Sequence, residues 1–169
     1  FTKLLPIHGG YVGDDDYFGS FDDDDPRSKL MVEVGDQEQD ALRRPDQRRI
    51  SAKNVLDTDN LAGLRRAIIT FVVAVSVRRW QQGEAGERAK KYAMVIHNDI
   101  ARSAHAWQDQ VIDWIFQAIL GAAESDPSLL RPLFDAAYDD IEASVLADKG
   151  KAPPRDDAFD AFIDALQSD

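Results

Sequence analysis

The segment YAMVIHN, residues 92–98, decides the predicted fold. It is a short apolar run that ends on polar residues, which is typical of a strand buried on both faces of a parallel sheet. Asn98 can cap the helical pattern that follows, so the segment predicts a strand, a turn and a helix, which is half of a βαβ unit. Ligands of open α/β sheets bind at the carboxyl ends of such strands. We therefore expect a functional role for His97; the alternatives are a helix-capping imidazole and a half-buried histidine bonded to backbone.

Most of the remaining chain has a helical pattern. Apolar residues recur at helical spacing from Thr58 to just before Gly83, from about 100 to 123, from Ser125 onward and again near the C-terminus. The sequence therefore predicts a mostly α protein with few strands. We divide it into an irregular Gly- and Asp-rich segment (1–57), a helix–strand–helix part (58–124) and a helical extension (125–169).

A single strand cannot satisfy its own backbone hydrogen-bonding groups. The sheet therefore needs further strands, either within residues 1–57, where residues 30–34 (LMVEV) have a strand-like composition, or from other parts of a longer protein. Residues 41–49 are polar and fit either a loop or a weak helix. The first residue is Phe1 instead of Met, with no signal-peptide pattern, so we expect the chain to be a fragment of a longer protein.

Composition narrows the function classes. The chain has 169 residues and no cysteine, which excludes disulfides, thiolate zinc sites and thiol nucleophiles and fits the cytoplasm, our expected location. A net charge of -11 argues against nucleic-acid binding by the chain as a whole. Basic pairs such as Arg78 and Arg79 keep a local basic face as an alternative. The longest apolar stretch, residues 67–77, is shorter than the roughly 20 residues of a membrane helix, so we expect no membrane partner.

Searches for chemistry-bearing patterns give no complete site. Residues 14–25 partly match a calcium-binding EF-hand loop, but Phe18 occupies a ligand position and Asp25 replaces the bidentate glutamate, so a solvated acidic run is the favoured interpretation. His97 and His105 lack a third ligand for a metal. The sequence contains no phosphate-binding loop and no nucleophile elbow. We therefore predict no catalytic residue, no metal site and no cofactor in this chain alone.

Three segments in this order resemble the Z-one domain family, which is described as an endonuclease domain of restriction-modification and phage-defence systems. Residues 11–19 (YVGDDDYFG) are similar to that family's Tyr-Ile-Gly-x-x-x-Phe-x-Gly loop. Residues 64–79 are similar to the family helix that ends in paired arginines, and residues 94–97 (MVIH) to its Met-Leu-Ile-His strand. The family often has His-x-x-Met-x-x-His at this strand, where the present chain has Lys91 at the first position.

The resemblance implies a fragment of an α/β RecA-like lobe within an ATP-dependent DNA translocase or helicase-like subunit. Such a parent protein would use ATP and Mg²⁺, move along duplex DNA and activate a nuclease subunit or domain. The residues that would couple ATP hydrolysis to movement or contact DNA are His97 and Asn98, with Arg78, Arg79 and His105 as weaker candidates.

Two other functions compete with the motor. The amphipathic helices of residues 100–169 carry no evident chemistry, so the chain is alternatively a non-catalytic helical protein-interaction module that forms a homo-oligomer through its C-terminal helices, where Phe159 and Phe162 are the apolar residues to test. Direct nuclease activity is the third hypothesis, but the acidic run lacks the accompanying lysine of an Asp…Glu-x-Lys metal site.

Overall fold

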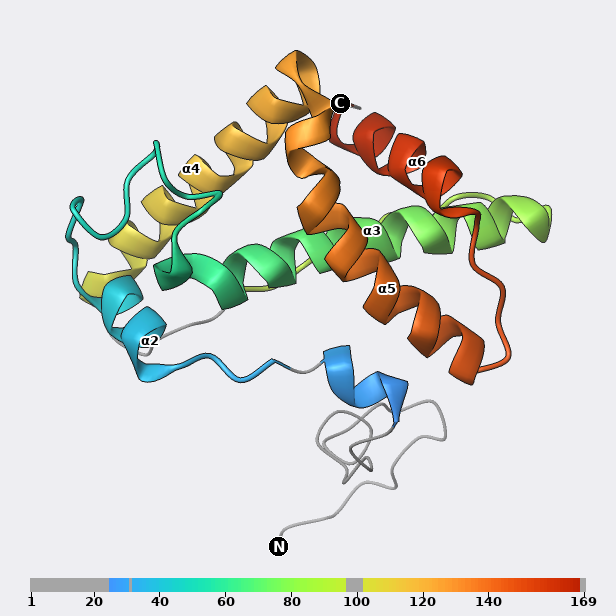
Figure 1. Ribbon diagram of the computed structural model, residues 1–169, viewed down its shortest axis with the longest axis horizontal. Coiled ribbons are helices and arrows are strands. Elements are labelled where there is room, and N and C mark those ends of the chain that lie inside the picture. Colours follow the sequence, from blue (N-terminus) through green and yellow to red (C-terminus); the bar gives the residue numbers. More distant parts are fainter. Residues whose placement is uncertain (1–24, 31, 97–101, 168–169) are drawn as a thin grey trace, which may run out of the picture.

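The computed structural model describes residues 25–30, 32–96 and 102–167, and all regular secondary structure in these residues is helical (Figure 1). The described residues form four long helices, one short helix and three 3-10 turns. In chain order the elements are η1 (Pro26–Leu30), α2 (Asp36–Arg43), η2 (Asp59–Leu61), α3 (Ala62–Glu84), α4 (Arg102–Ser125), η3 (Pro127–Leu130), α5 (Arg131–Ala147) and α6 (Arg155–Gln167).

The prediction of an α/β RecA-like lobe is wrong, because the described residues contain no sheet. Residues 92–96 lie outside any helix, as predicted, but no described segment pairs with their backbone to make them a strand. The other candidate strand fails as well, since Leu30 ends η1 and residues 32–34 are irregular. An apolar run of this length fits an extended segment packed on helices as well as a sheet strand, and periodicity alone does not separate the two.

Helix α3 is the central element and is apolar on most of its sides, as the sequence predicts. Thr58 accepts a hydrogen bond from the backbone N–H of Asn60 and so caps the 3-10 turn η2, as expected of a capping residue here, and η2 leads directly into α3 at Ala62. The helix continues past Gly83 to Glu84, two residues beyond the predicted end. Gly86 then adopts a φ of 68°, a left-handed conformation that glycine reaches without strain, and the chain turns back.

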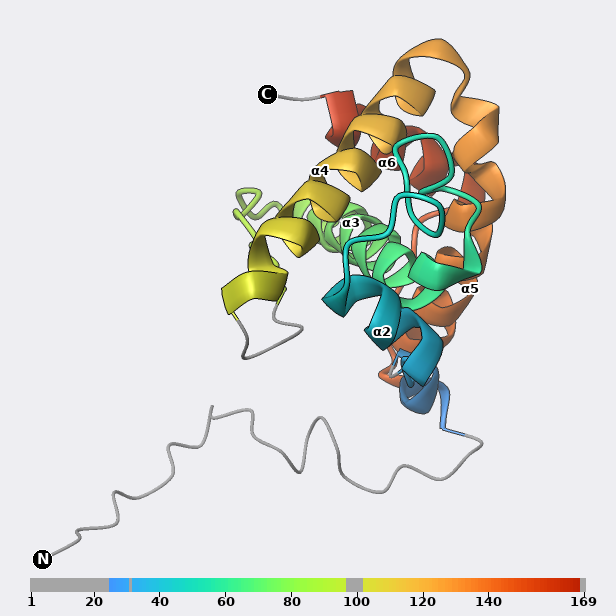
Figure 2. The same cartoon turned by 90° about the vertical axis from the view of Figure 1, so that its left-hand side faces the viewer.

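Helices α5 and α6 cover one side of α3, with α5 crossing it and α4 leading toward both (Figures 1 and 2). Their contact is built around Phe134, whose ring centroid lies 5.1 Å from that of Phe159 and 5.5 Å from that of Phe162. Phe134 and Phe162 are completely buried. Each such side chain contributes roughly 1.5–3 kcal/mol by leaving water. Phe162 is thus core of this chain, and its substitution would unfold α6 before it could report on an oligomer interface.

Charged side chains surround this aromatic contact. Arg131 forms ion pairs with Asp135 at 3.0 Å and Asp156 at 2.9 Å, and its guanidinium lies 5.0 Å from the ring centroid of Phe159. Arg155 pairs with Asp139 across the same α5–α6 contact. Exposed pairs of this kind contribute about 0–1 kcal/mol each, so the network fixes orientation more than it adds stability.

The C-terminal end of α2 is joined to α4 by two side chains. Trp107 donates its indole N–H to the carbonyl of Ala41 at 2.9 Å, and Gln108 donates its amide to the carbonyl of Leu42 at 3.4 Å. The last carbonyls of a helix have no partner within the helix, so these bonds satisfy acceptors that α2 cannot satisfy alone. They hold α2 and α4 together beside the N-terminal half of α3.

Candidate functional site

Two neighbouring cavities flank the N-terminal half of α3. One has a volume of about 440 Å³ and lies toward α2 and α4; the other, about 610 Å³, lies toward η1 and α5. Val34, Gly63, Ala67 and Met94 line both, so the two cavities adjoin, and we call them together the α3 groove. Most of the side chains along it are apolar, and the exposed Val32 stands at its edge.

Glu38 fixes the geometry of the α3 groove. The side chain comes from α2, is 6% exposed, and accepts hydrogen bonds from the backbone N–H groups of Gly63 at 2.9 Å and Leu64 at 2.8 Å. A carboxylate at a helix N-terminus satisfies unpaired donors and interacts favourably with the helix dipole. Gly63 permits this approach, because a Cβ there would lie 3.2 Å from Glu38 Oε2 and 3.0 Å from a methyl carbon of Val34.

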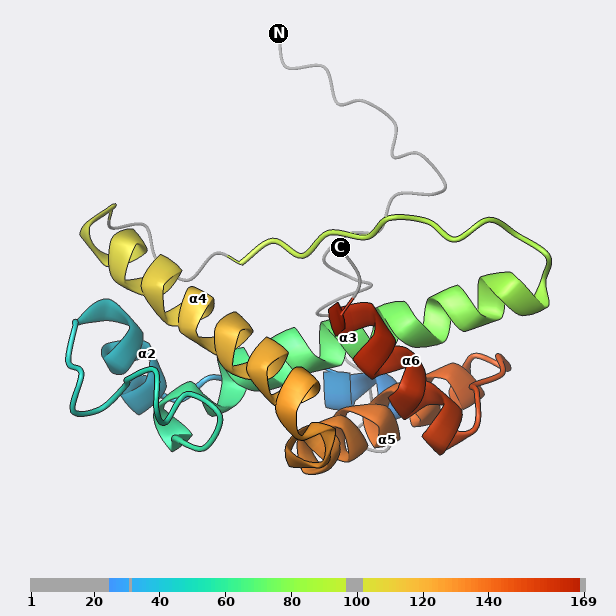
Figure 3. The same cartoon turned by 90° about the horizontal axis from the view of Figure 1, so that it is seen from above.

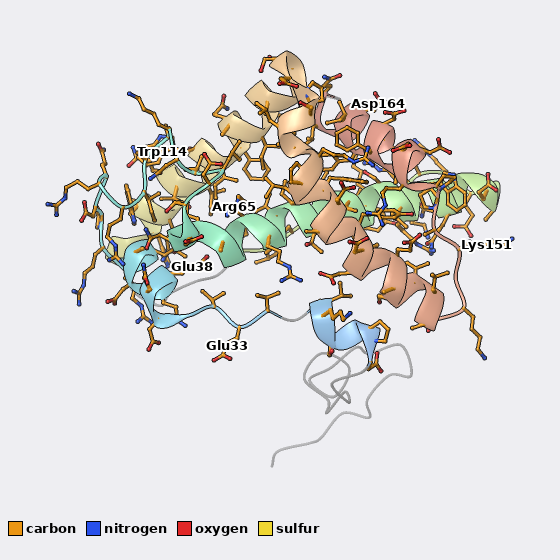
Figure 4. All side chains as sticks on the ribbon, in the orientation of Figure 1. Glu33, Glu38, Arg65, Trp114, Lys151 and Asp164 are labelled. Atoms are coloured by element: carbon orange, nitrogen blue, oxygen red, sulfur yellow. The ribbon has the colours of Figure 1, made fainter. Side chains whose placement is uncertain are left out.

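Arg65 stabilises the loop that leads into α3. Its guanidinium is largely buried and donates hydrogen bonds to the carbonyls of Val55 at 3.1 Å and Thr58 at 2.9 Å. Burial lowers the pKa of this guanidinium, while the carboxylates of Asp57 and Glu38 act in the opposite direction. Figure 4 labels Arg65 and Glu38 at this junction of α2 and α3. Glu38 therefore holds the start of α3 against α2, and Arg65 holds the preceding loop against α3.

Two of the charged groups that line the α3 groove, Glu38 and Arg66, already have partners, whereas Lys29 is exposed at its edge. Glu38 is saturated by two backbone donors, and Arg66 pairs with Asp140 at 2.5 Å. The groove therefore offers mainly apolar surface, and its arrangement suits binding of apolar side chains better than acid–base or phosphate chemistry. Among the described residues, no group of three or more His, Asp or Glu side chains is placed to hold a metal ion.

Residues 87–96 run back beside α3, and Met94, Val95 and Ile96 at the end of this segment border the groove (Figure 3). Lys90 donates its backbone N–H to the side-chain oxygen of the buried Gln82 at 3.3 Å, which anchors the start of this segment. Met94 and Ile96 are partly buried against the core, whereas Val95 between them is 88% exposed. Residues 93–96 therefore lie along the bundle with alternating outward and inward side chains, whereas residues 87–92 are exposed.

The predicted site residues do not form one cluster. His97 and Asn98 lie outside the described residues. Arg78 and Arg79 are exposed near the C-terminal end of α3, where Arg78 hydrogen-bonds Gln81 at 3.1 Å. His105 is half-buried near the start of α4, and Figures 1 and 3 place the end of α3 and the start of α4 on opposite sides of the molecule. The arginines and His105 thus belong to separate surfaces.

Sequence reasoning missed Glu38 and Gly63, the two residues that shape the groove. Glu38 stands in a polar stretch without a periodic signal, Gly63 carries no side chain that could mark it, and the two meet across 25 positions of chain. The acidic run considered for calcium, residues 14–25, lies outside the described residues except for Asp25.

The segment Asp59–Glu84 is long and apolar enough to cross a membrane by length and composition, with a mean hydropathy of 1.5 in its most apolar window. The central helix of a water-soluble protein has the same properties, and 44% of that window is buried inside this protein. This segment is longer than the apolar stretch of residues 67–77 considered in the sequence, because the helix continues through the arginine pairs on both sides of that stretch.

Comparison with known proteins finds no relative for this chain. No protein family matches it, and neither a curated protein nor a solved structure does.

Proposed function

We propose that the chain is a non-catalytic helical protein-interaction module that binds a segment of another protein in the α3 groove. The observation that carries this proposal is the pair of adjoining apolar cavities, about 440 and 610 Å³, along one helix. Grooves of this kind in helical proteins take up apolar side chains of a peptide segment. The carboxylate of Glu38 and the guanidinium of Arg66, two groups that would orient a small substrate, are already bound to Gly63, Leu64 and Asp140.

A charge placed in the groove tests the proposal. Ala67 is exposed on α3 and lines both cavities, so Ala67→Glu puts a carboxylate in the groove without disturbing the core. Gln117→Glu adds the same charge at an exposed position of α4 that lines neither cavity. Each tagged protein is incubated with an extract of its source cells, and the retained polypeptides are identified and quantified by mass spectrometry.

The proposal predicts one identified polypeptide that the unsubstituted protein and Gln117→Glu retain in equal amounts. The amount retained by Ala67→Glu should be about tenfold lower. The purified pair should then reproduce this ratio of dissociation constants. Equal retention by all three proteins would assign the interaction to another surface. Binding of no polypeptide would contradict the proposed function.

A second candidate is a contribution to an ATP-dependent DNA translocase of a restriction or anti-phage system. It is supported by the three sequence segments and by the exposure of Arg78 and Arg79, which could reach a phosphate backbone. In that case the longer protein hydrolyses ATP faster with duplex DNA, and His97→Ala or the double substitution Arg78→Ala, Arg79→Ala reduces or uncouples this stimulation. Absence of ATP hydrolysis with and without DNA would reject it.

A further inference from the structure

Residues 92–96 have the arrangement of a strand that lacks a sheet. Met94 and Ile96 pack against the helices, whereas Ala93 and Val95 face outward, and Val95 is 88% exposed. Tyr92 adds a second exposed apolar side chain at the start of the segment. An alternation of inward and outward side chains is the pattern of a β-strand with one covered face.

The backbone of this segment is available for pairing. Within the described part of the chain, no hydrogen bond involves the backbone N–H or C=O groups of residues 91–96, whereas Lys90 just before them is held by Gln82. An extended segment with a row of unpaired N–H and C=O groups is a template for a second strand. Val95 stands within that row, one residue from its end.

Charge indicates the kind of strand that fits. Arg88, Lys90 and Lys91 are all exposed immediately before the apolar residues, with Glu87 as the one nearby acid in this stretch. The chain as a whole carries a net charge of -11, so this short basic end contrasts with the rest of the molecule. A partner strand with acidic residues at one end and alternating apolar residues beyond them complements both halves of the segment.

We propose that residues 88–96 bind an acidic, extended strand of a partner protein by strand addition. The partner's backbone pairs with residues 92–96, and its acidic residues lie beside Arg88, Lys90 and Lys91. Alternate side chains of the partner then reach into the α3 groove next to Met94, which lines both cavities. This inference rests on the proposed function, because it names the class of segment that the groove receives.

Fluorescence anisotropy with synthetic peptides tests the proposal directly. The probes are fluorescein-labelled VTVTVDE and its reverse EDVTVTV, which place the acids correctly for antiparallel and parallel pairing. The controls are the same peptides with Lys in place of Asp and Glu, and a peptide of identical composition whose apolar residues do not alternate. We expect one acidic, alternating probe to bind at least tenfold more tightly than every control.

Two variants of the protein separate backbone pairing from other modes of binding. Val95→Pro removes a backbone N–H from an exposed, extended position, whereas Val95→Thr keeps the N–H at the same site. We expect Val95→Pro to raise the dissociation constant of the binding probe about tenfold. Val95→Thr should change this constant less than threefold. The double substitution Lys90→Glu, Lys91→Glu should also raise the dissociation constant of the probe about tenfold. Bound probe should protect the amides of residues 92–96 from hydrogen exchange.

Each remaining outcome contradicts the inference. Binding that ignores Val95→Pro, or absence of binding by both acidic probes, rejects strand addition. Self-association that Val95→Pro abolishes, measured by light scattering, assigns the segment to a second copy of this chain instead. A polypeptide whose binding is reduced by Ala67→Glu can bind Val95→Pro as tightly as the unsubstituted protein. In that case the proposed function survives and only the strand inference fails.

Discussion

The carboxylate of Glu38 accepts a hydrogen bond from the backbone N–H of Leu64 at 2.8 Å, so a side chain of α2 caps a helix that begins more than twenty residues later. Helix caps usually come from the residue just before the helix. Here Leu61 precedes α3 and cannot supply one. The cap therefore depends on tertiary structure, and it couples the stability of α3 to the placement of α2.

Removal of this cap should destabilise the protein. We expect Glu38→Ala to lower the free energy of unfolding by about 1–3 kcal/mol, because two buried backbone donors lose their acceptor. Urea denaturation measures the change. Asp40→Ala on the same helix removes an exposed carboxylate and should change stability by less than about 0.5 kcal/mol. Equal effects of the two substitutions would contradict the capping role.

Two glycines of α3 should respond differently to alanine. Gly83→Ala introduces a Cβ with nothing within 4 Å and should stabilise the helix by up to about 1 kcal/mol. Gly63→Ala gains the same helix propensity but brings its Cβ to 3.0 Å from Val34 Cγ2 and 3.2 Å from Glu38 Oε2. Thermal unfolding should therefore rank Gly83→Ala clearly above Gly63→Ala. A gain of the same size at both positions would show that Val34 and Glu38 move aside freely.

Lys149 occupies a position at the end of α5 that favours glycine. Its φ is 59°, and the next residue, Gly150, donates its N–H to the carbonyl of Val145 at 2.8 Å. This arrangement ends many helices, usually with glycine in the left-handed position. Lys149→Gly should raise the free energy of unfolding by about 0.5–1 kcal/mol in denaturant titrations. Lys151→Gly, two residues on, lacks this constraint and should not stabilise.

Gly150→Ala tests the same turn from the other side. A Cβ at Gly150 would lie 2.9 Å from Val145 Cγ1 and 3.0 Å from the Val145 carbonyl oxygen. Since a backbone atom cannot move aside cheaply, the substitution should lower the thermal midpoint. An unchanged midpoint would mean that the turn relaxes without cost.

Tyr138 should make the protein sensitive to strong alkali. Burial raises the pKa of its phenol to about 12, and the carboxylate of Glu142 acts in the same direction. In the unfolded chain the phenol ionises near pH 10. Stability is therefore fully present below about pH 10 and falls as the pH rises toward 12, because only the unfolded state ionises readily. Tyr138→Phe should reduce the alkaline loss of stability, and ultraviolet absorbance should show one late-titrating tyrosine.

The helices could be predicted from the sequence because their apolar spacing extends over many turns. The capping residue Thr58 and the apolar residues of α3 are local signals, and the structure confirms them. The sheet could not be predicted correctly, because residues 92–96 satisfy the composition of a strand and pack one face without a partner. Whether an extended segment joins a sheet depends on a second segment, which local sequence does not reveal.

The groove could not be predicted for a similar reason. Its shape depends on contacts between residues far apart in the chain, such as Trp107 with Ala41 and Glu38 with Gly63. Neither pair has a spacing that a periodic pattern can detect. The predicted coupling residues Arg78, Arg79 and His105 lie elsewhere, and the role of His97 and Asn98 stays a prediction.

The basic end at Arg88, Lys90 and Lys91 also governs how the purified protein behaves in solution. In the sequence these cations directly precede the segment with Tyr92 and Val95, the exposed apolar residues that favour self-association. Like charges on two approaching molecules repel, and salt screens that repulsion over about 10 Å at 0.1 M. Dilute buffer should therefore keep the protein dispersed, whereas concentrated salt or neutralisation of these lysines should promote precipitation.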